Sequence, residues 1–282
     1  MFGIILSSLG ALWEEVGLSI GKTKVAARQE SIYTMAFLDM MWGVVIFLVM
    51  VAWTKGKIFT FTVASLPTFG LRTVLELILA EITVRAITTA SRSTFGFLRT
   101  LTIPLLLGID IVLGYVIGPW QIVGMALVVL TIVWLSYSHG LERRGMGLVL
   151  GTAVLAAVTL SLYKYDITHF NSVVGEQLVL MAILVLYFWG KARFVAGESP
   201  EKFLRQPVFL LQSASAGVAS LLGSFAFVFA PASVILAAKR SSAVLWALLS
   251  GRRYFQEQRF AAKLLGFFFL AAGLVLLALN SS

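Results

Sequence analysis

The sequence has no cysteine, and it contains little that could bind a metal or support soluble catalysis. The absence of cysteine excludes disulfides and thiolate metal sites. Only two histidines and six prolines occur. There is no glycine-rich nucleotide loop, no Ser/His/Asp arrangement and no HExxH motif. We therefore expect no catalytic residues, no bound metal and no cofactor, and we do not expect an enzyme.

Charged residues are also scarce. They make up 12% of the chain, whereas 59% of the residues are hydrophobic and the mean hydropathy is +0.94. A soluble core of 282 residues could not hide so much apolar surface, so the composition predicts an integral membrane protein. The net charge of +9 gathers in short turns between apolar runs, where it orients helices in the lipid bilayer. We expect no nucleic-acid partner.

Apolar runs of about 17 to 22 residues are long enough to cross a hydrocarbon core of about 30 Å. The sequence predicts ten such spans and therefore an all-α membrane protein. Carboxylates stand where a signal-peptide cleavage site would be, so we expect the first span to be retained. The predicted spans are 3–22, 32–53, 69–88, 91–110, 116–136, 146–164, 172–190, 207–228, 231–250 and 260–279.

Charged residues repeat along the chain at a spacing of about 140 residues. Lys22, which ends the first span, recurs as Lys164 at the end of the sixth. Arg99 in the fourth span recurs as Lys239 and Arg240 in the ninth. These matches predict two five-helix repeats.

The predicted repeats are residues 1–140 and 141–282. An odd number of spans per repeat inverts the second repeat relative to the first. Inverted repeats with a site at their interface are typical of secondary transporters.

The last two spans carry a family resemblance. Residues 237–277, AAKRSSAVLWALLSGRRYFQEQRFAAKLLGFFFLAAGLVLL, resemble the ten-helix drug/metabolite transporters of the EamA type, with Glu257 where the family has an acidic turn. The resemblance implies two five-helix repeats, secondary transport and a multi-pass protein of a bacterial or archaeal plasma membrane. The first span, LGALWEEVGLSIGKTK, also resembles the first helix of the small multidrug resistance transporters. In that match Glu15 corresponds to their essential carboxylate.

Two carboxylates, Glu14 and Glu15, lie about halfway along the first span. A carboxylate is costly in a low-dielectric environment, so either could take up and release a proton during transport. The alternative is a structural ion pair, with Lys22 or with a charge on another span. We favour Glu15 for proton coupling because of its match to the multidrug transporters.

The third span contains four charged residues in two oppositely charged pairs. Arg72 and Glu76 are four residues apart, as are Glu81 and Arg85, so each pair can neutralise itself within one helix. This pattern favours a structural role. Of the four, Glu81 is the candidate for contact with substrate.

Each predicted repeat has one set of basic residues within its fourth span. These are Arg99 in the first repeat and the pair Lys239 and Arg240 in the second. Together they could clamp a carboxylate or a phosphate, with a guanidinium supplying two parallel hydrogen bonds. The Lys-Arg pair resembles the phosphate-binding pair of the plastid phosphate-sugar exchangers. The alternative is that these cations pair with acidic residues of the first and third spans and hold helices together.

Two tryptophans, Trp13 and Trp246, lie deep enough in their spans for contact with a ligand.

We expect a transporter that exports or exchanges a small polar metabolite, amino-acid-like or anionic, with a proton as the coupling ion. One alternative is an exporter of lipophilic cations, and another is a non-transporting membrane enzyme or scaffold. We expect a monomer, because ten spans can enclose a site. The charge of the loops and the family resemblance predict opposite orientations in the membrane.

Overall fold

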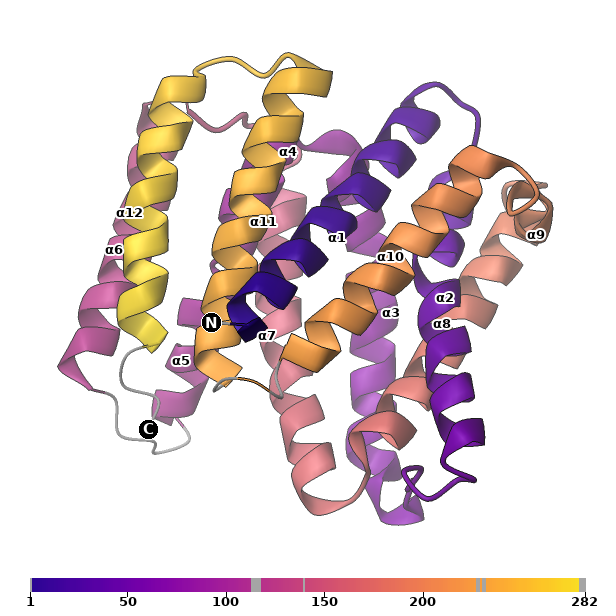
Figure 1. Cartoon of the computed structure of the whole chain (residues 1–282). Helices are drawn as coiled ribbons and strands as arrows, with labels where there is room; N and C mark the ends of the chain where they lie inside the picture. Colours follow the sequence, from indigo (N-terminus) through magenta and orange to yellow (C-terminus); the bar gives the residue numbers. More distant parts are fainter. Residues whose placement is uncertain (1, 113–117, 139, 227–228, 230–231, 279–282) are drawn as a thin grey trace. The chain divides into compact units, whose positions relative to one another are not determined.

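The computed structural model describes residues 2–112, 118–138, 140–226, 229 and 232–278, and every regular element among them is helical. Figure 1 shows these elements in chain order. They are α1 (Phe2–Ala26), α2 (Ile32–Trp53), the 3-10 turn η1 (Val63–Ser65), α3 (Leu66–Thr89), α4 (Arg92–Arg99), α5 (Thr102–Val112), α6 (Pro119–Tyr137), α7 (Met146–His169), α8 (Val173–Phe194), α9 (Pro200–Phe203), α10 (Pro207–Ala226), α11 (Ala232–Phe255) and α12 (Phe260–Ala278).

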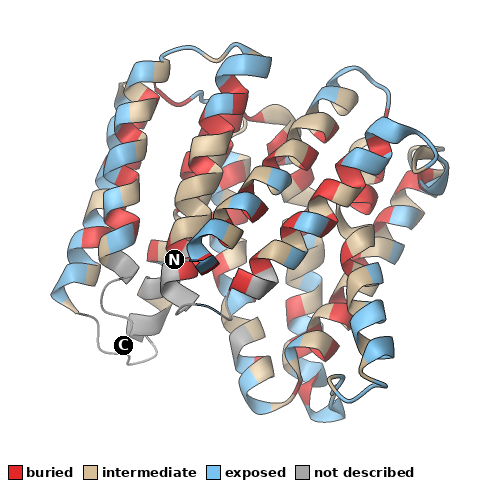
Figure 2. Cartoon of the chain, viewed as in Figure 1, coloured by how far each residue is buried: buried red, intermediate tan, exposed pale blue. Residues whose placement is uncertain are grey.

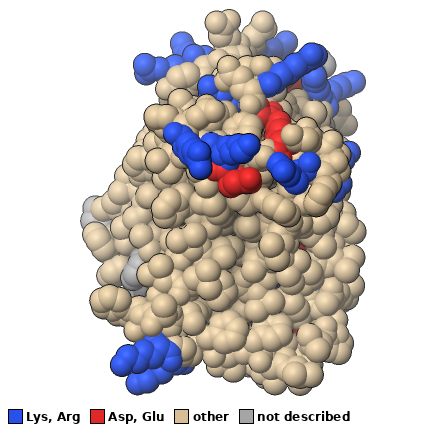
Figure 3. Space-filling model, turned by 90° about the vertical axis from the view of Figure 1, so that its right-hand side faces the viewer, with Lys and Arg blue, Asp and Glu red and all other residues tan. Residues whose placement is uncertain are grey.

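The helices confirm that this is a multi-pass membrane protein. Within the described residues, six helices are both long and apolar enough to cross a bilayer: α1, α2, α3 with its preceding turn, α6, α7 and α8. Two shorter apolar stretches are found in α10 and α12. On the face drawn in Figure 3, Lys and Arg gather toward one end and a broad, almost uncharged band lies below them. Such a band fits contact with lipid.

Most predicted spans coincide with one helix whose ends differ by a few residues. The exception is 91–110, which is divided into α4 and α5. The predicted span ends at positions 116, 228, 231 and 279 lie outside the described residues, as do the span positions 117 and 227.

The division between α4 and α5 has a local chemical cause. The hydroxyl of Thr100 donates to the carbonyl of Phe97 at 2.6 Å, and the hydroxyl of Thr102 donates to the carbonyl of Arg99 at 2.9 Å. Pro104 has no amide hydrogen, so it cannot donate to the carbonyl of Thr100 one turn earlier. At this point the backbone amides of Thr100, Leu101 and Ile103 donate three residues back instead of four, and the hydroxyls add bonds to nearby carbonyls, so the α-helix is interrupted directly after Arg99.

The chain forms two compact units. Unit 1 contains residues 1–15, 89–154 and 219–282, and unit 2 contains residues 16–88 and 155–218. Each unit combines segments from both halves of the sequence. The predicted division at residue 140 is a division along the chain and stays a prediction.

In unit 1, α12 packs against α6 and α11, and α11 also packs against α4. Small residues allow the close contact of α6 and α12, which lie side by side in Figure 1. A Cβ at Gly266 would lie 2.7 Å from the side chain of Leu135, and one at Gly273 would lie 3.0 Å from the carbonyl of Gly124. Leu135 and Val128, on the same side of α6, are fully buried.

In unit 2, α2 packs against α8. A Cβ at Gly43 of α2 would lie 3.0 Å from the sulfur of Met181 of α8. Gly217 of α10 lies against Trp42 of α2, at 2.8 Å for an added Cβ. Figure 2 colours the helices by burial. In α8 the buried residues Leu184, Phe188 and Ala192 are four apart and so lie on one face, whereas in α2 burial is concentrated in the first turns, at 34–38.

Candidate functional site

Helix α4 is eight residues long and its first turn is held by side chains from elsewhere in unit 1. Ser91 is the N-cap residue and accepts from the amide of Thr94 at 3.3 Å. The carboxylate of Glu257 accepts from the amide of Arg92 at 2.5 Å, from the amide of Ser93 at 3.3 Å and from the Ser93 hydroxyl. An anion at a helix N-terminus satisfies free amides and interacts favourably with the helix dipole. This capping fixes where α4 begins.

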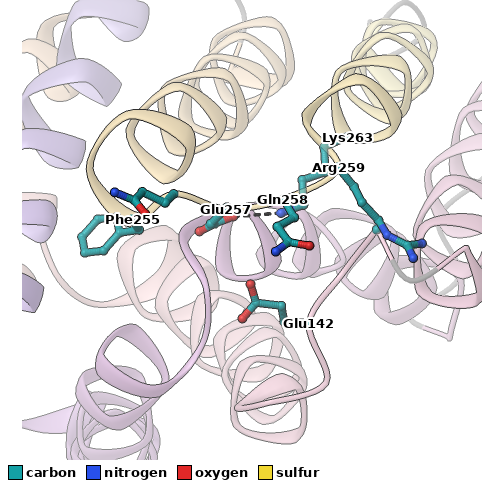
Figure 4. A pocket seen from close by; sticks show the side chains of 8 residues that line it. Glu142, Phe255, Glu257, Gln258, Arg259 and Lys263 are labelled. Carbon is teal, nitrogen blue, oxygen red and sulfur yellow. Dashed lines mark hydrogen bonds and ion pairs between the residues drawn. The ribbon is translucent and has the colours of Figure 1, made fainter.

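Glu257 is itself held in the turn between α11 and α12. Its carboxylate pairs with the buried ammonium of Lys263 at 3.0 Å. A Cβ at Gly251 would approach the same carboxylate to 2.7 Å, so only glycine leaves room for it. The turn borders a polar cavity of about 280 Å³ lined by Gly140, Glu142, residues 255–259 and Lys263, shown in Figure 4.

A buried ion pair joins α1 to the first residue of α4. Arg92 Nε lies 2.9 Å from Glu15 Oε1, and Arg92 Nη2 lies 2.5 Å from Glu15 Oε2. The Ser250 hydroxyl donates to Glu15 Oε1 at 2.6 Å. Arg92 is 1% exposed and Glu15 is 7% exposed. The carboxylate predicted for proton coupling is thus fully engaged by a guanidinium and a hydroxyl.

A second ion-pair group involves the neighbouring residue of α1, and its members are partly exposed. Glu14 Oε1 lies 3.2 Å from Arg99 Nη1, and Glu14 Oε2 lies 3.3 Å from Lys239 Nζ. About 28% of the Glu14 side chain, 33% of Arg99 and 30% of Lys239 are exposed. Arg240, next to Lys239 on α11, lies close enough to Glu14 and Arg99 to interact with both through its charge. The structure therefore brings four of the predicted site residues together.

The two predicted tryptophans behave differently. The indole nitrogen of Trp246 donates to the backbone carbonyl of Ser8 at 3.2 Å, which ties α11 to α1. Trp13 is 37% exposed. Both belong to unit 1, as do Glu14, Glu15 and the three basic residues.

Glu81 belongs to unit 2. It accepts from the hydroxyl of Tyr187 at 2.8 Å, and it pairs with Lys191 at 3.1 Å and with Arg85 at 3.4 Å. The predicted pairing of Glu81 with Arg85 within α3 is thus confirmed, but Lys191 of α8 is the closer cation.

The other predicted pair of α3 is a small part of a larger buried network. Arg72 lies 3.9 Å from Glu76 but only 2.6 Å from Glu176 of α8. Asn171 donates to Glu176 at 2.5 Å. The Arg72 guanidinium also lies 4.5 Å from the centroid of the Tyr163 ring. This network holds α3, α7 and α8 together within unit 2.

Sequence reasoning missed Arg92, the residue that binds Glu15. It lies at the start of a predicted span, where a basic side chain is ordinarily explained by contact with lipid headgroups. The available signal was its spacing from Arg99. The two arginines are seven residues apart, about two helical turns, and so lie on the same face.

The unit 1 site contains four cationic groups, Arg92, Arg99, Lys239 and Arg240, against the two carboxylates of α1. This excess of positive charge suits an anion. Among the described residues no group of three or more His, Cys, Asp or Glu side chains could hold a metal ion.

No protein-family model and no curated protein sequence matches this chain.

Proposed function

We propose that this protein is a secondary active transporter that exports or exchanges a small anionic or amino-acid-like metabolite. The observation that carries the proposal is the contact of Glu14, halfway along the apolar helix α1, with Arg99 at the end of α4 and with Lys239 of α11. Charged groups within membrane spans are costly and commonly mark a path for substrate or ions.

The architecture proposed for this function is ten spans arranged as two inverted five-helix repeats, with alternating access to a central site. The interruption between α4 and α5 supports it, because secondary transporters commonly bind their ligands beside discontinuous helices. The residue that precedes the interruption is Arg99, one of the cations of the proposed site.

The proposed mechanism is competition for the same cations. In the described state the Glu14 carboxylate occupies Arg99 and Lys239. A substrate carboxylate or phosphate can bind these two groups only when Glu14 leaves them. The guanidinium of Arg99 would contribute two parallel hydrogen bonds, and Lys239 and Arg240 would contribute charge.

A proton would couple to this exchange through Glu14. Protonation removes the negative charge of Glu14 and so releases Arg99 and Lys239 for the substrate. Glu14 is about 28% exposed, whereas Glu15 is buried against Arg92 and Ser250. Glu15 stays in the proposal as a second proton-coupling carboxylate, and its use would require the buried pair with Arg92 to open.

The charge distribution favours an anion over a lipophilic cation. In an exporter of lipophilic cations, Glu15 and Glu81 would attract the substrate. Both already have cationic partners in the described state, Arg92 for Glu15 and Lys191 for Glu81.

The first experiment is a thermal-shift screen of the purified protein with sulfate, phosphate, a sugar phosphate, amino acids and tetraphenylphosphonium. A ligand that binds only the folded state raises the melting temperature. We expect an anion to stabilise the protein. That effect should be lost in Arg99→Gln and Lys239→Gln and kept in Arg253→Gln, a control on the exposed end of α11.

The next step is flux of the stabilising anion into sealed proteoliposomes. Transport by the wild type and by Arg253→Gln, but not by Arg99→Gln, supports the proposal. Stabilisation by tetraphenylphosphonium that disappears in Glu15→Gln would favour the cation exporter. A folded protein that neither binds nor moves any of these compounds would favour a scaffold or a membrane enzyme.

A further inference from the structure

The loop between α1 and α2 contains a buried carboxyl group, that of Glu30 in unit 2. Only 3% of Glu30 is exposed. Within the described part of the chain, neither carboxyl oxygen has a hydrogen-bond partner. A charged carboxylate is stable in a protein interior only when cations or hydrogen-bond donors compensate it.

The charged groups nearest to Glu30 make ionisation less favourable. Asp39 of α2 and Glu198, which follows α8, are both acidic and act on it through their charge. Lys24 near the end of α1 is the cation acting on Glu30, but its ammonium donates to Gln29 at 2.7 Å. Among the described residues, therefore, Glu30 forms no ion pair with a cation.

Glu198 has strong local compensation. It accepts from the amide of Ser31 at 3.1 Å, from the Ser31 hydroxyl at 2.7 Å and from the Thr34 hydroxyl at 2.5 Å. These donors at the start of α2 stabilise a negative charge on Glu198. That charge then opposes a second one on Glu30.

An uncharged polar group beside Glu30 also lacks a partner. Gln212 of α10 is fully buried, and both its amide nitrogen and its amide oxygen are without a hydrogen bond among the described residues. Gln212 nevertheless lies within reach of Glu30: its amide nitrogen can donate to the ionised carboxyl, which lowers the pKa of Glu30, and its amide oxygen is free to face the protonated form. An amide oxygen can accept a hydrogen bond from a protonated carboxyl, which an ionised carboxylate cannot donate.

We propose that Glu30 is a proton-binding site, loaded at neutral pH and emptied under mildly alkaline conditions, in which the protonated carboxyl donates to the buried amide of Gln212. The proton comes from water and returns to water, and no other bond is made or broken. The contact would hold the α1–α2 loop against α10 within unit 2. The site is separate from the carboxylates of unit 1, and it does not depend on the proposed transport function.

Electrostatics agrees with this assignment. Burial, followed by the charge of Asp39, raises the pKa of the Glu30 carboxyl to about 8, and Gln212 and Lys24 only partly oppose the shift. The unfolded chain releases this proton near the ordinary pKa of 4.5, whereas the folded protein keeps it until about pH 8. Glu30 therefore contributes stability below about pH 4.5 that is lost progressively as the pH rises to about 8.

The test compares wild type, Glu30→Gln and Glu201→Gln by melting temperature from pH 5 to pH 9. Glutamine mimics the protonated carboxyl, and Glu201 is an exposed carboxylate a few residues from Glu198. The melting temperature of wild type and Glu201→Gln should fall toward pH 8 more steeply than that of Glu30→Gln. At pH 8.5 Glu30→Gln should be the most stable of the three. Parallel curves for all three proteins would overturn the proposal.

Infrared titration provides a readout that does not depend on stability. The wild type should show a carboxylic-acid carbonyl band at pH 6.5 that disappears around pH 8 and is missing from Glu30→Gln. If Glu30→Gln does not fold, Glu30→Asp should shift this band. A band that is unchanged by either substitution, or one lost already near pH 5, would refute the assignment.

Discussion

Arg92 binds Glu15 through two nitrogen–oxygen contacts of 2.9 and 2.5 Å, and both side chains are buried. One residue earlier on α1, Glu14 forms its pair with Arg99 at 3.2 Å where both side chains are about one-third exposed. The arginines are the first and last residues of α4. One short helix therefore carries a sealed ion pair at its beginning and an accessible one at its end.

Removing one partner of the sealed pair should be strongly destabilising. Arg92→Gln leaves the Glu15 carboxylate buried without its cation, a change that typically costs about 3–5 kcal/mol. The double variant Arg92→Gln/Glu15→Gln should lose clearly less than the sum of the two single variants. Unfolding midpoints in detergent, with Arg253→Gln as the control, measure this difference. Additive losses would show that the two side chains do not stabilise each other.

Losing the accessible pair of Glu14 and Arg99 should affect ligand binding more than stability. Because these side chains are about one-third exposed, whereas Arg92 and Glu15 are buried, Glu14→Gln should lower the melting temperature less than Arg92→Gln. Its effect should be on ligands, because Arg99 and Lys239 lose their internal competitor. We expect Glu14→Gln to bind the stabilising anion several-fold more tightly than wild type in a titration. Weaker binding would mean that Glu14 contacts the ligand directly and does not compete with it.

Anion binding should also depend on pH through Glu14. A bound anion takes Arg99 and Lys239 away from Glu14, which then accepts a proton more readily, so the wild type should bind anions more tightly as the pH falls. Sulfate is a suitable probe because its own charge does not change over the pH range in which a carboxyl group of ordinary pKa titrates. The pH dependence should disappear in Glu14→Gln and remain in Glu201→Gln. If the anion affinity of Glu14→Gln still changes with pH, the group that titrates is another residue.

The contact between Gly251 and Glu257 predicts a stability effect in the α11–α12 turn. Alanine at position 251 would force the Glu257 carboxylate away from the α4 N-terminus and from Lys263. Gly251→Ala should lower the melting temperature, whereas Gly147→Ala, which meets open space, should be neutral or stabilising by up to about 1 kcal/mol. In a Glu257→Ala background, which has no carboxyl group to meet the added methyl, the Gly251→Ala effect should shrink. An equal effect in both backgrounds would place the strain elsewhere.

The sequence was sufficient to predict the apolar helices, because runs of this length and hydropathy leave few alternatives to membrane spans. It was not sufficient to predict the interruption after Arg99. Hydropathy treats the segment around Thr100 and Thr102 as an ordinary apolar run, whereas hydroxyl bonds to carbonyls and the missing amide hydrogen of Pro104 decide the geometry.

Most charged members of the candidate site were predicted, but Arg92 was not, and neither were the pairings. Placing Glu14, Arg99 and Lys239 inside spans required only their positions in the sequence. Which carboxylate binds which cation depends on helix rotation, which one sequence does not reveal. For the same reason the partners Ser250 for Glu15 and Glu176 for Arg72 became visible only in the structure.

The two arginines of α4 also restrict how this helix can move against α1. Glu14 and Glu15 point about 100° apart around α1, so sliding or rolling α4 along α1 would break both pairs together. A tilt about the end that carries Arg92 is the movement that opens the Arg99–Glu14 contact while the buried pair stays intact. The Arg92–Glu15 pair would then stay in place, while the opposite end of the eight-residue helix, with Arg99, moves away from Glu14.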